Sequence, residues 1–143
     1  MVNVIKPVNR YTSNEFHDWQ RENLPGQFII QDLDTWSMVI SDTNQNFEPL
    51  FLVELKRSFI DPEKWEPFRN DINNYLAIFK FSQKANVPLM IIYFKKGVMF
   101  NDDTKIAIFK VLNVDKDSDK WIECSKKIIS CKEFKQNFPN NLL

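Results

Sequence analysis

The sequence predicts an α/β fold in which a mixed β-sheet carries helices on its faces. Two strand-like segments, 35–41 and 50–56, are separated by a short turn, which favours antiparallel pairing. A segment of helical periodicity, 62–84, then leads to an apolar segment, 88–94, which favours a parallel crossover. With 143 residues, 43% of them apolar, the chain can bury one core, so we expect a single domain over 1–143.

The first predicted element is a helix over 12–24. Thr12 and Glu15 have the spacing of a capping box, in which the side chain of each residue accepts a hydrogen bond from the backbone N–H of the other. Phe16 and Trp19 are three residues apart and give the helix one apolar edge. A Leu-Pro-Gly sequence follows and ends the helix.

Three strands are predicted after this helix. Segment 27–31 is short and rich in strand-forming residues, and 35–41 alternates between apolar and polar residues. Segment 42–46 is composed of turn-forming residues. Segment 50–56 is apolar up to Glu54, as expected of a central strand covered on both faces.

The second half of the chain adds two helices and two strands. The helix over 62–84 has Pro67 in its first regular turn and apolar residues at steps of three and four. Strands are predicted at 88–94 and 106–112. A capping sequence predicts a last short helix over about 130–138.

Glu54 and Lys56 are charged residues at the end of the most apolar strand. Residues at i and i+2 share a face of a strand, and charges there are costly to bury unless they are paired or bind metal. Asp32 and Asp34 lie upstream, between the first two predicted strands. Two carboxylates beside a lysine suit phosphodiester hydrolysis: the acids bind Mg²⁺ and the lysine stabilises charge on the phosphate.

This pattern of residues and elements resembles the PD-(D/E)XK nucleases. The signature here reads Asp34, Glu54 and Lys56, and the resemblance covers about 12–95, which leaves 96–143 as C-terminal additions. It implies a restriction-endonuclease-like fold, whose core is a helix, three strands, a helix and a strand. It also implies cleavage of DNA, less often of RNA, with Mg²⁺ or Mn²⁺ as the cofactor.

The resemblance also assigns roles to individual residues. It implies that Asp34 and Glu54 bind the metal, with the Leu55 carbonyl as a third ligand, and that Lys56 is catalytic. Glu15 corresponds to an acid on the first helix that binds metal in many members, although it can equally serve as a helix cap.

The sequence contains further candidates for the site besides Asp34, Glu54 and Lys56. Asp32 competes with Asp34 for the ligand role. Some members place a Gln near the phosphate on the helix after the lysine; this chain instead has Asn73 and Asn74 there, which is a departure from the family pattern. The remaining candidates are two arginines that could contact phosphate, Arg57 and Arg69.

Composition excludes several other classes of protein. No segment approaches the ~20 apolar residues of a membrane span, and the N-terminus does not resemble a signal peptide. Cys124 and Cys131 lack the spacing of a zinc site, and we expect them to be free thiols in the cytoplasm. With only two glycines, the chain has no glycine-rich phosphate loop.

The predicted function is therefore a magnesium-dependent deoxyribonuclease whose partner is nucleic acid, DNA rather than RNA, acting as a monomer or a homodimer. Acidic residues are in excess over 1–75 and basic residues over 76–143, which suits a metal site beside a phosphate-binding surface. Two alternatives remain open. One is a non-catalytic binding, inhibitor or immunity module on the same fold, favoured by the net charge of zero. The other is an RNA-processing nuclease, which would share the site.

Overall fold

The computed structural model describes Trp19, Glu22, Asn23 and segments 35–40 and 47–138. The chain divides into two compact units, which we describe separately: residues 1–32 and residues 33–143. In the first unit the three described residues have helical backbone, and the side-chain amide of Asn23 donates a hydrogen bond of 2.8 Å to the carbonyl of Trp19.

Several predictions fall on residues outside this description. They are the rest of the helix predicted over 12–24, the strand predicted over 27–31 and the turn predicted over 42–46. These three predictions therefore remain predictions.

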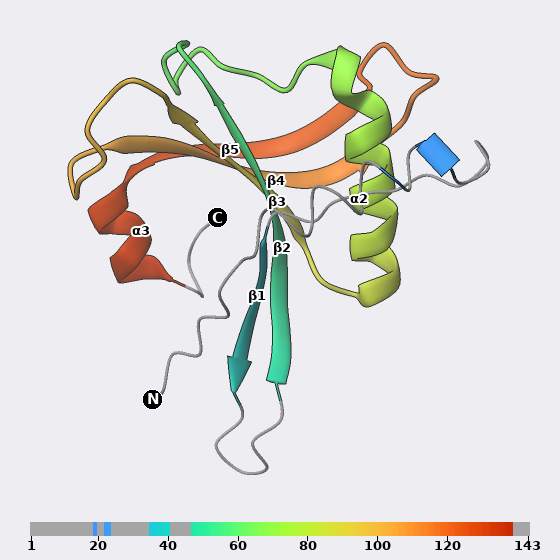
Figure 1. The fold of residues 1–143 in the computed structure, drawn as a ribbon, viewed down its shortest axis with the longest axis horizontal. Helices are drawn as coiled ribbons and strands as arrows, with labels where there is room; N and C mark the ends of the chain where they lie inside the picture. Colours follow the sequence, from blue (N-terminus) through green and yellow to red (C-terminus); the bar gives the residue numbers. More distant parts are fainter. Residues whose placement is uncertain (1–18, 20–21, 24–34, 41–46, 139–143) are drawn as a thin grey trace. The chain divides into compact units, whose positions relative to one another are not determined.

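The second unit is built on a five-stranded mixed sheet (Figure 1) with the spatial order β1-β2-β3-β4-β5. The strands are β1 Thr35–Ile40, β2 Phe47–Ser58, β3 Leu89–Lys95, β4 Lys105–Val114 and β5 Ile122–Ser130. β2 runs parallel to β3, and the other three neighbouring pairs are antiparallel. The predicted α/β class, with a mixed sheet and a helical crossover, is confirmed.

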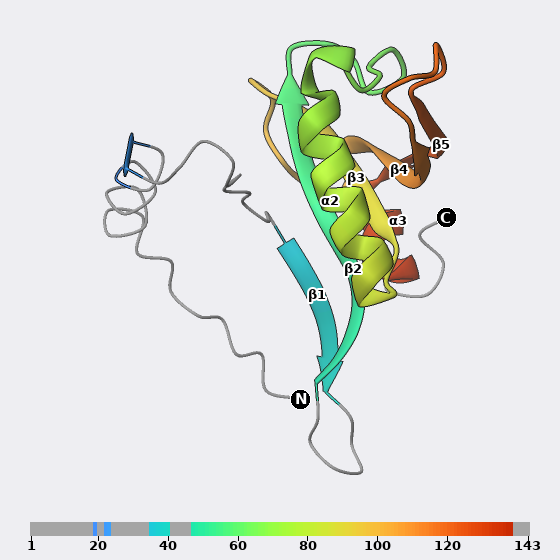
Figure 2. The same ribbon diagram turned by 90° about the vertical axis from the view of Figure 1, so that its right-hand side faces the viewer.

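Helices cover both faces of this sheet. On one face, α2 (Ile72–Ala85) packs Tyr75, Ile78 and Phe79 into a core with residues of β2, β3 and β4. On the other face, α3 (Cys131–Asn137) packs Phe134 against a second core. Figure 2 shows α2 lying along β2 and β3. Because successive strand residues point to opposite faces, β2 contributes Leu52 to the first core and its neighbours to the second.

The α-helix predicted over 62–84 is wrong over residues 62–71. A short 3₁₀ helix, η1, covers Arg69–Asp71, and α2 begins only at Ile72. Pro67 disfavours helical backbone in the residue before it and has no N–H to donate. Phe68, which fitted the helical period, has extended backbone and caps η1.

The structure agrees with the predicted end of the helix over 62–84 and with the predicted start of the helix over about 130–138. Asn86 adopts a left-handed conformation with φ of 57° and ends α2, as a C-terminal cap does. Ser130 and Glu133 form the predicted capping box at the start of α3: the Glu133 amide donates to the Ser130 hydroxyl at 3.1 Å.

β5 was not predicted. Its residues alternate between half-buried and exposed along most of its length, as in an edge strand with one covered face. Polar and charged residues such as Glu123, Lys126 and Lys127 interrupt the apolar residues of β5. The segment therefore has no apolar run before Ile128 that would have indicated a strand. Within the described residues, no helix is both long and apolar enough to span a bilayer.

Candidate functional site

Glu54 and Lys56 lie on the face of β2 that is covered by α2. They follow Leu52 at steps of two along the strand, and Leu52 belongs to the core beneath α2. β2 is paired with β1 on one side and β3 on the other, so it is an inner strand of the sheet. Glu54 is only 7% exposed, which makes it a buried acid that requires partners.

The first turn of α2 supplies those partners. The Asn74 side-chain amide donates a hydrogen bond of 2.8 Å to Glu54 Oε1, and Lys56 Nζ lies 3.4 Å from the same oxygen. Lys56 Nζ also donates to Asp71 Oδ2 at 3.5 Å and lies 5.3 Å from the centre of the Tyr75 ring. We call Glu54, Lys56, Asp71 and Asn74 the acid–lysine cluster.

The topology explains why these residues meet. β2 leads into a loop, and α2 then runs back along the strand before the chain enters β3 (Figure 1). The start of α2 therefore returns to the end of β2, close to Lys56. Asn74 and Tyr75 follow Asp71 by three and four residues. All three therefore lie on the side of α2 and its N-cap that faces β2.

The acid–lysine cluster has an excess of negative charge. The carboxylates of Glu54 and Asp71 share one ammonium group, that of Lys56. Such a set of hard oxygen ligands beside a cation suits a divalent metal ion and a phosphate. In the part of the chain that the structure describes, no three His, Cys, Asp or Glu side chains are grouped closely enough to hold a metal ion.

Tyr75 lies beneath this cluster and is fully buried. Its hydroxyl has no hydrogen-bond partner among the described residues. Burial raises the pKa of this hydroxyl above its ordinary value of 10.0, and the carboxylates of Asp71 and Glu54 raise it further. Tyr75 is therefore a neutral phenol whose hydroxyl is costly to bury.

We expect Tyr75→Phe to raise the free energy of unfolding by about 1 kcal/mol, because it removes a buried polar group without a partner. The effect depends on pH. The pKa of Tyr75 is higher in the folded state than in the unfolded chain, so ionisation of the phenol favours unfolding. The free energy of unfolding is therefore unaffected by this group below pH 10 and falls as the pH rises above 10. Urea unfolding at neutral and alkaline pH measures both effects, and the variant should lose less stability above pH 10.

The matched control is Tyr93→Phe. Tyr93 is equally buried, but its hydroxyl donates to the Ile60 carbonyl at 2.6 Å and is 2.6 Å from the Ser58 hydroxyl. We expect this variant to lose about 1–2 kcal/mol of stability. Equal changes in the two variants would contradict the assignment of Tyr75 as the unsatisfied group.

The structure brings some of the predicted site residues together and leaves others apart. Asn74 contacts Glu54, whereas Asn73 is exposed on α2. Leu55 points to the opposite face of β2 from Glu54, so only its carbonyl could serve a metal there. The other members of the predicted site, Asp34, Asp32 and Glu15, lie outside the described residues.

Neither predicted phosphate-binding arginine contacts the acid–lysine cluster. Arg57 is exposed and follows Lys56, so its side chain leaves the opposite face of β2. Arg69 is exposed, and its guanidinium donates at 3.5 Å to the carbonyl of Lys116. Asp71 was not predicted; its distance of three residues from Asn74 is the signal that could have identified it.

The two cysteines, Cys124 and Cys131, are half-buried. Both are free thiols, and burial raises the pKa of the Cys124 thiol to about 12, with a smaller contribution from Glu66. Burial therefore keeps the Cys124 thiol protonated at neutral pH, and a protonated thiol is a poor nucleophile. Burial also raises the pKa of Cys131.

Comparison with known proteins adds no relative. No protein-family model matches the sequence, and it has no match among curated proteins or solved structures.

Proposed function

We propose that this chain is a metal-dependent nuclease of the PD-(D/E)XK type that hydrolyses phosphodiester bonds of DNA in the cytoplasm. The observation that carries the proposal is the pairing of Glu54 and Lys56 on one face of an inner strand, where the following helix supplies Asp71 and Asn74. The order of the elements also supports the proposal. The second strand of an antiparallel hairpin carries Glu54 and Lys56, and a helix and a parallel strand follow it, as in part of a restriction-endonuclease-like core.

The register of the hairpin supports a role for Asp34, although Asp34 itself lies outside the described residues. Thr35, which follows it, pairs with Val53, which precedes Glu54. We take Asp34 as the ligand that shares the ion with Glu54, as the resemblance implies.

The donor set fits Mg²⁺ or Mn²⁺. In the proposal, Asp34, Glu54 and the Leu55 carbonyl hold the ion. Glu15 and Asp32 lie outside the described residues, and their roles stay predictions from the sequence. The acid–lysine cluster alone has two carboxylates and one ammonium group, and Asp34 would bring the excess to two negative charges. When bound, the ion would polarise the phosphate and acidify a water molecule.

The protein's own residues then have distinct tasks. Lys56 donates hydrogen bonds to the phosphate or the attacking water and stabilises the charge that develops there. Asn74 fixes the orientation of the Glu54 carboxylate through its 2.8 Å hydrogen bond. Asp71 accepts a hydrogen bond from the ammonium of Lys56 and so limits the conformations of this long side chain.

Titration calorimetry with Mn²⁺ tests the metal site. We expect the wild-type protein to bind one ion and Glu54→Gln to lose that binding, because the amide keeps the shape of the side chain but not its charge. Glu123→Gln, on the exposed side of β5, is the matched control and should bind like the wild type. Equal binding by wild type and Glu54→Gln would exclude Glu54 as a ligand.

A second candidate is the non-catalytic module. The observation in its favour is that Glu54 and Lys56 pair with each other, while Asn74 donates a hydrogen bond to Glu54 and Asp71 accepts one from Lys56, so each of these side chains has a partner within the protein. Such a network can be purely structural. This candidate predicts no metal binding by the wild type and no cleavage of DNA or RNA, whereas an RNA-processing nuclease would bind the metal and cut RNA alone.

A further inference from the structure

The loop that joins β2 to α2, residues 59–68, presents two exposed aromatic rings. Phe59 is 71% exposed and Phe68 is 52% exposed. Phe59 comes three residues after Lys56, and Phe68 comes three residues before Asp71. The two rings therefore lie at either end of the loop that connects the two halves of the acid–lysine cluster.

The loop holds these rings on a fixed base. Between them, Trp65 is buried and stacks on Tyr93 with ring centroids 4.4 Å apart. Lys126, from β5, donates hydrogen bonds to the carbonyls of Trp65 at 2.9 Å and Glu63 at 3.2 Å. The rings are thus exposed on an anchored loop, which lowers the entropy cost of binding a ligand.

Each ring also has a defined local contact. The ammonium of Lys96 lies 5.0 Å from the centre of the Phe59 ring. Phe68 packs the edge of its ring on Trp65 at a centroid distance of 6.0 Å. Both contacts leave a large part of the ring accessible.

The charges around the rings favour an anionic ligand. Each acid of the loop is paired with a lysine of the sheet: Asp61 with Lys95 at 2.9 Å, Glu63 with Lys105 at 3.7 Å, and Glu66 with Lys126 at 3.2 Å. By contrast, Lys64, Lys96 and Arg69 are exposed and form no ion pair within the described residues. Lys64 lies in the loop, Arg69 follows it directly, and Lys96 lies beside the Phe59 ring, so cations that form no ion pair among the described residues accompany the exposed aromatic rings.

We propose that Phe59 and Phe68 stack on the unpaired bases of a single DNA strand, with Lys96 and Arg69 contacting its phosphates, and that this strand enters the acid–lysine cluster. Aromatic rings interleaved with cations bind single strands, because every base offers a π-face and every linkage offers a charge. In a duplex the base faces are stacked on each other and inaccessible to the rings. The inference rests on the proposed nuclease function and names its substrate class.

Fluorescence anisotropy with a labelled DNA oligonucleotide, single-stranded or annealed to its complement, tests the proposal. EDTA is present, so that binding is measured without cleavage. We expect tighter binding of the single strand, and a loss of about 5- to 100-fold in Phe59→Leu and in Phe68→Leu. Leu keeps an apolar side chain but has no ring. Phe59→Trp keeps an aromatic ring, so this variant should bind the single strand like the wild type.

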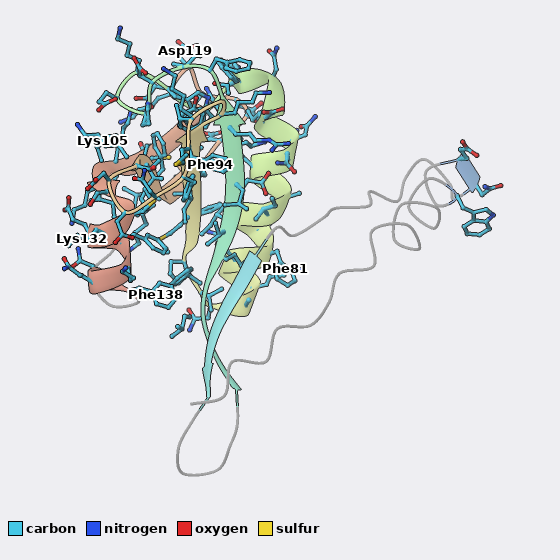
Figure 3. All side chains as sticks on the ribbon, turned by 60° about the vertical axis from the view of Figure 1, so that its left-hand side comes forward. Phe81, Phe94, Lys105, Asp119, Lys132 and Phe138 are labelled. Atoms are coloured by element: carbon cyan, nitrogen blue, oxygen red, sulfur yellow. The ribbon has the colours of Figure 1, made fainter. Side chains whose placement is uncertain are left out.

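Two matched controls separate the rings from general effects. Phe81 is also an exposed phenylalanine, at 43%, and Figure 3 shows it near the C-terminal end of α2, away from the loop, so Phe81→Leu should bind like the wild type. Lys96→Ala should reduce the slope of log K against log salt by roughly one, while Lys84→Ala should not change it.

The outcomes distinguish the inference from the proposed function. Equal affinity for duplex and single strand, no binding of either, or full affinity in both leucine variants would overturn the inference. Cleavage is assayed separately with Mg²⁺. If single-strand binding depends on the two rings but no DNA is cleaved, the nuclease function is rejected and binding by the rings is retained. If the protein cleaves duplex DNA and the two leucine substitutions do not affect the rate, the nuclease function is retained and binding by the rings is rejected.

Discussion

Lys56→Ala should lower the rate of DNA cleavage by about 10²–10³-fold, because it removes the one ammonium group of the acid–lysine cluster that can stabilise charge on the phosphate. Binding of the metal ion should persist or become tighter, since the variant leaves Glu54 and Asp71 without their shared cation. Single-turnover cleavage at saturating Mg²⁺ measures the rate, and calorimetry measures the metal.

Two companion variants make the result specific. Lys56→Met keeps most of the aliphatic length of the side chain, so it should be as inactive as Lys56→Ala while retaining more packing against Tyr75. Lys110→Ala removes an exposed lysine from β4 and should cleave at the wild-type rate. Cleavage that survives in both Lys56 variants would rule out Lys56 as the catalytic residue and would shift support to the non-catalytic module.

The inner part of the sheet could be predicted because its sequence signals are strong. β3 is an almost continuous apolar run and β2 contains a shorter one, residues 50–53, as expected of strands covered on both faces. The start of α3 was predicted from Ser130 and Glu133, since a capping box is a local interaction that needs no tertiary partner.

The β2–α2 loop could not be predicted in the same way. Trp65 and Phe68 fit a helical period with the residues that follow, so periodicity alone extends the helix backwards into the loop. In the structure Trp65 instead stacks on Tyr93, a contact between residues 28 positions apart that no local pattern contains. Tertiary packing has overridden the helical pattern.

The candidate site shows the same division between local and tertiary information. Glu54 and Lys56 were identified because charges at the end of an apolar strand conflict with burial, which is visible in the sequence. Asp71 was missed because its role depends on its contact with Lys56, which lies on β2, 15 positions earlier in the sequence. Its spacing of three and four residues from Asn74 and Tyr75 is visible in the sequence, but that spacing does not show that the start of α2 returns to the end of β2.

Trp65→Ala should lower the free energy of unfolding by about 3–5 kcal/mol, the largest stability effect we expect from one substitution. Trp65 is only 3% exposed and contacts three aromatic rings, those of Tyr93, Phe109 and Phe68. Its removal leaves a cavity at the sheet and frees the loop that joins Lys56 to Asp71. Urea unfolding followed by far-UV circular dichroism measures the change.

Phe81→Ala is the control for this prediction, since Phe81 is a large aromatic residue that is largely exposed and should lose about 1 kcal/mol or less. The loss of stability in Trp65→Phe should lie between those of Trp65→Ala and Phe81→Ala, because a smaller ring can still stack on Tyr93.

The anchoring of the loop also links stability to the site: a loosened loop should weaken the 3.5 Å contact between Asp71 and Lys56 and slow cleavage even in the folded fraction. A loss below about 1 kcal/mol in Trp65→Ala would mean that the stack on Tyr93 does not hold the loop, and Asp71 would then have to be positioned by α2 alone.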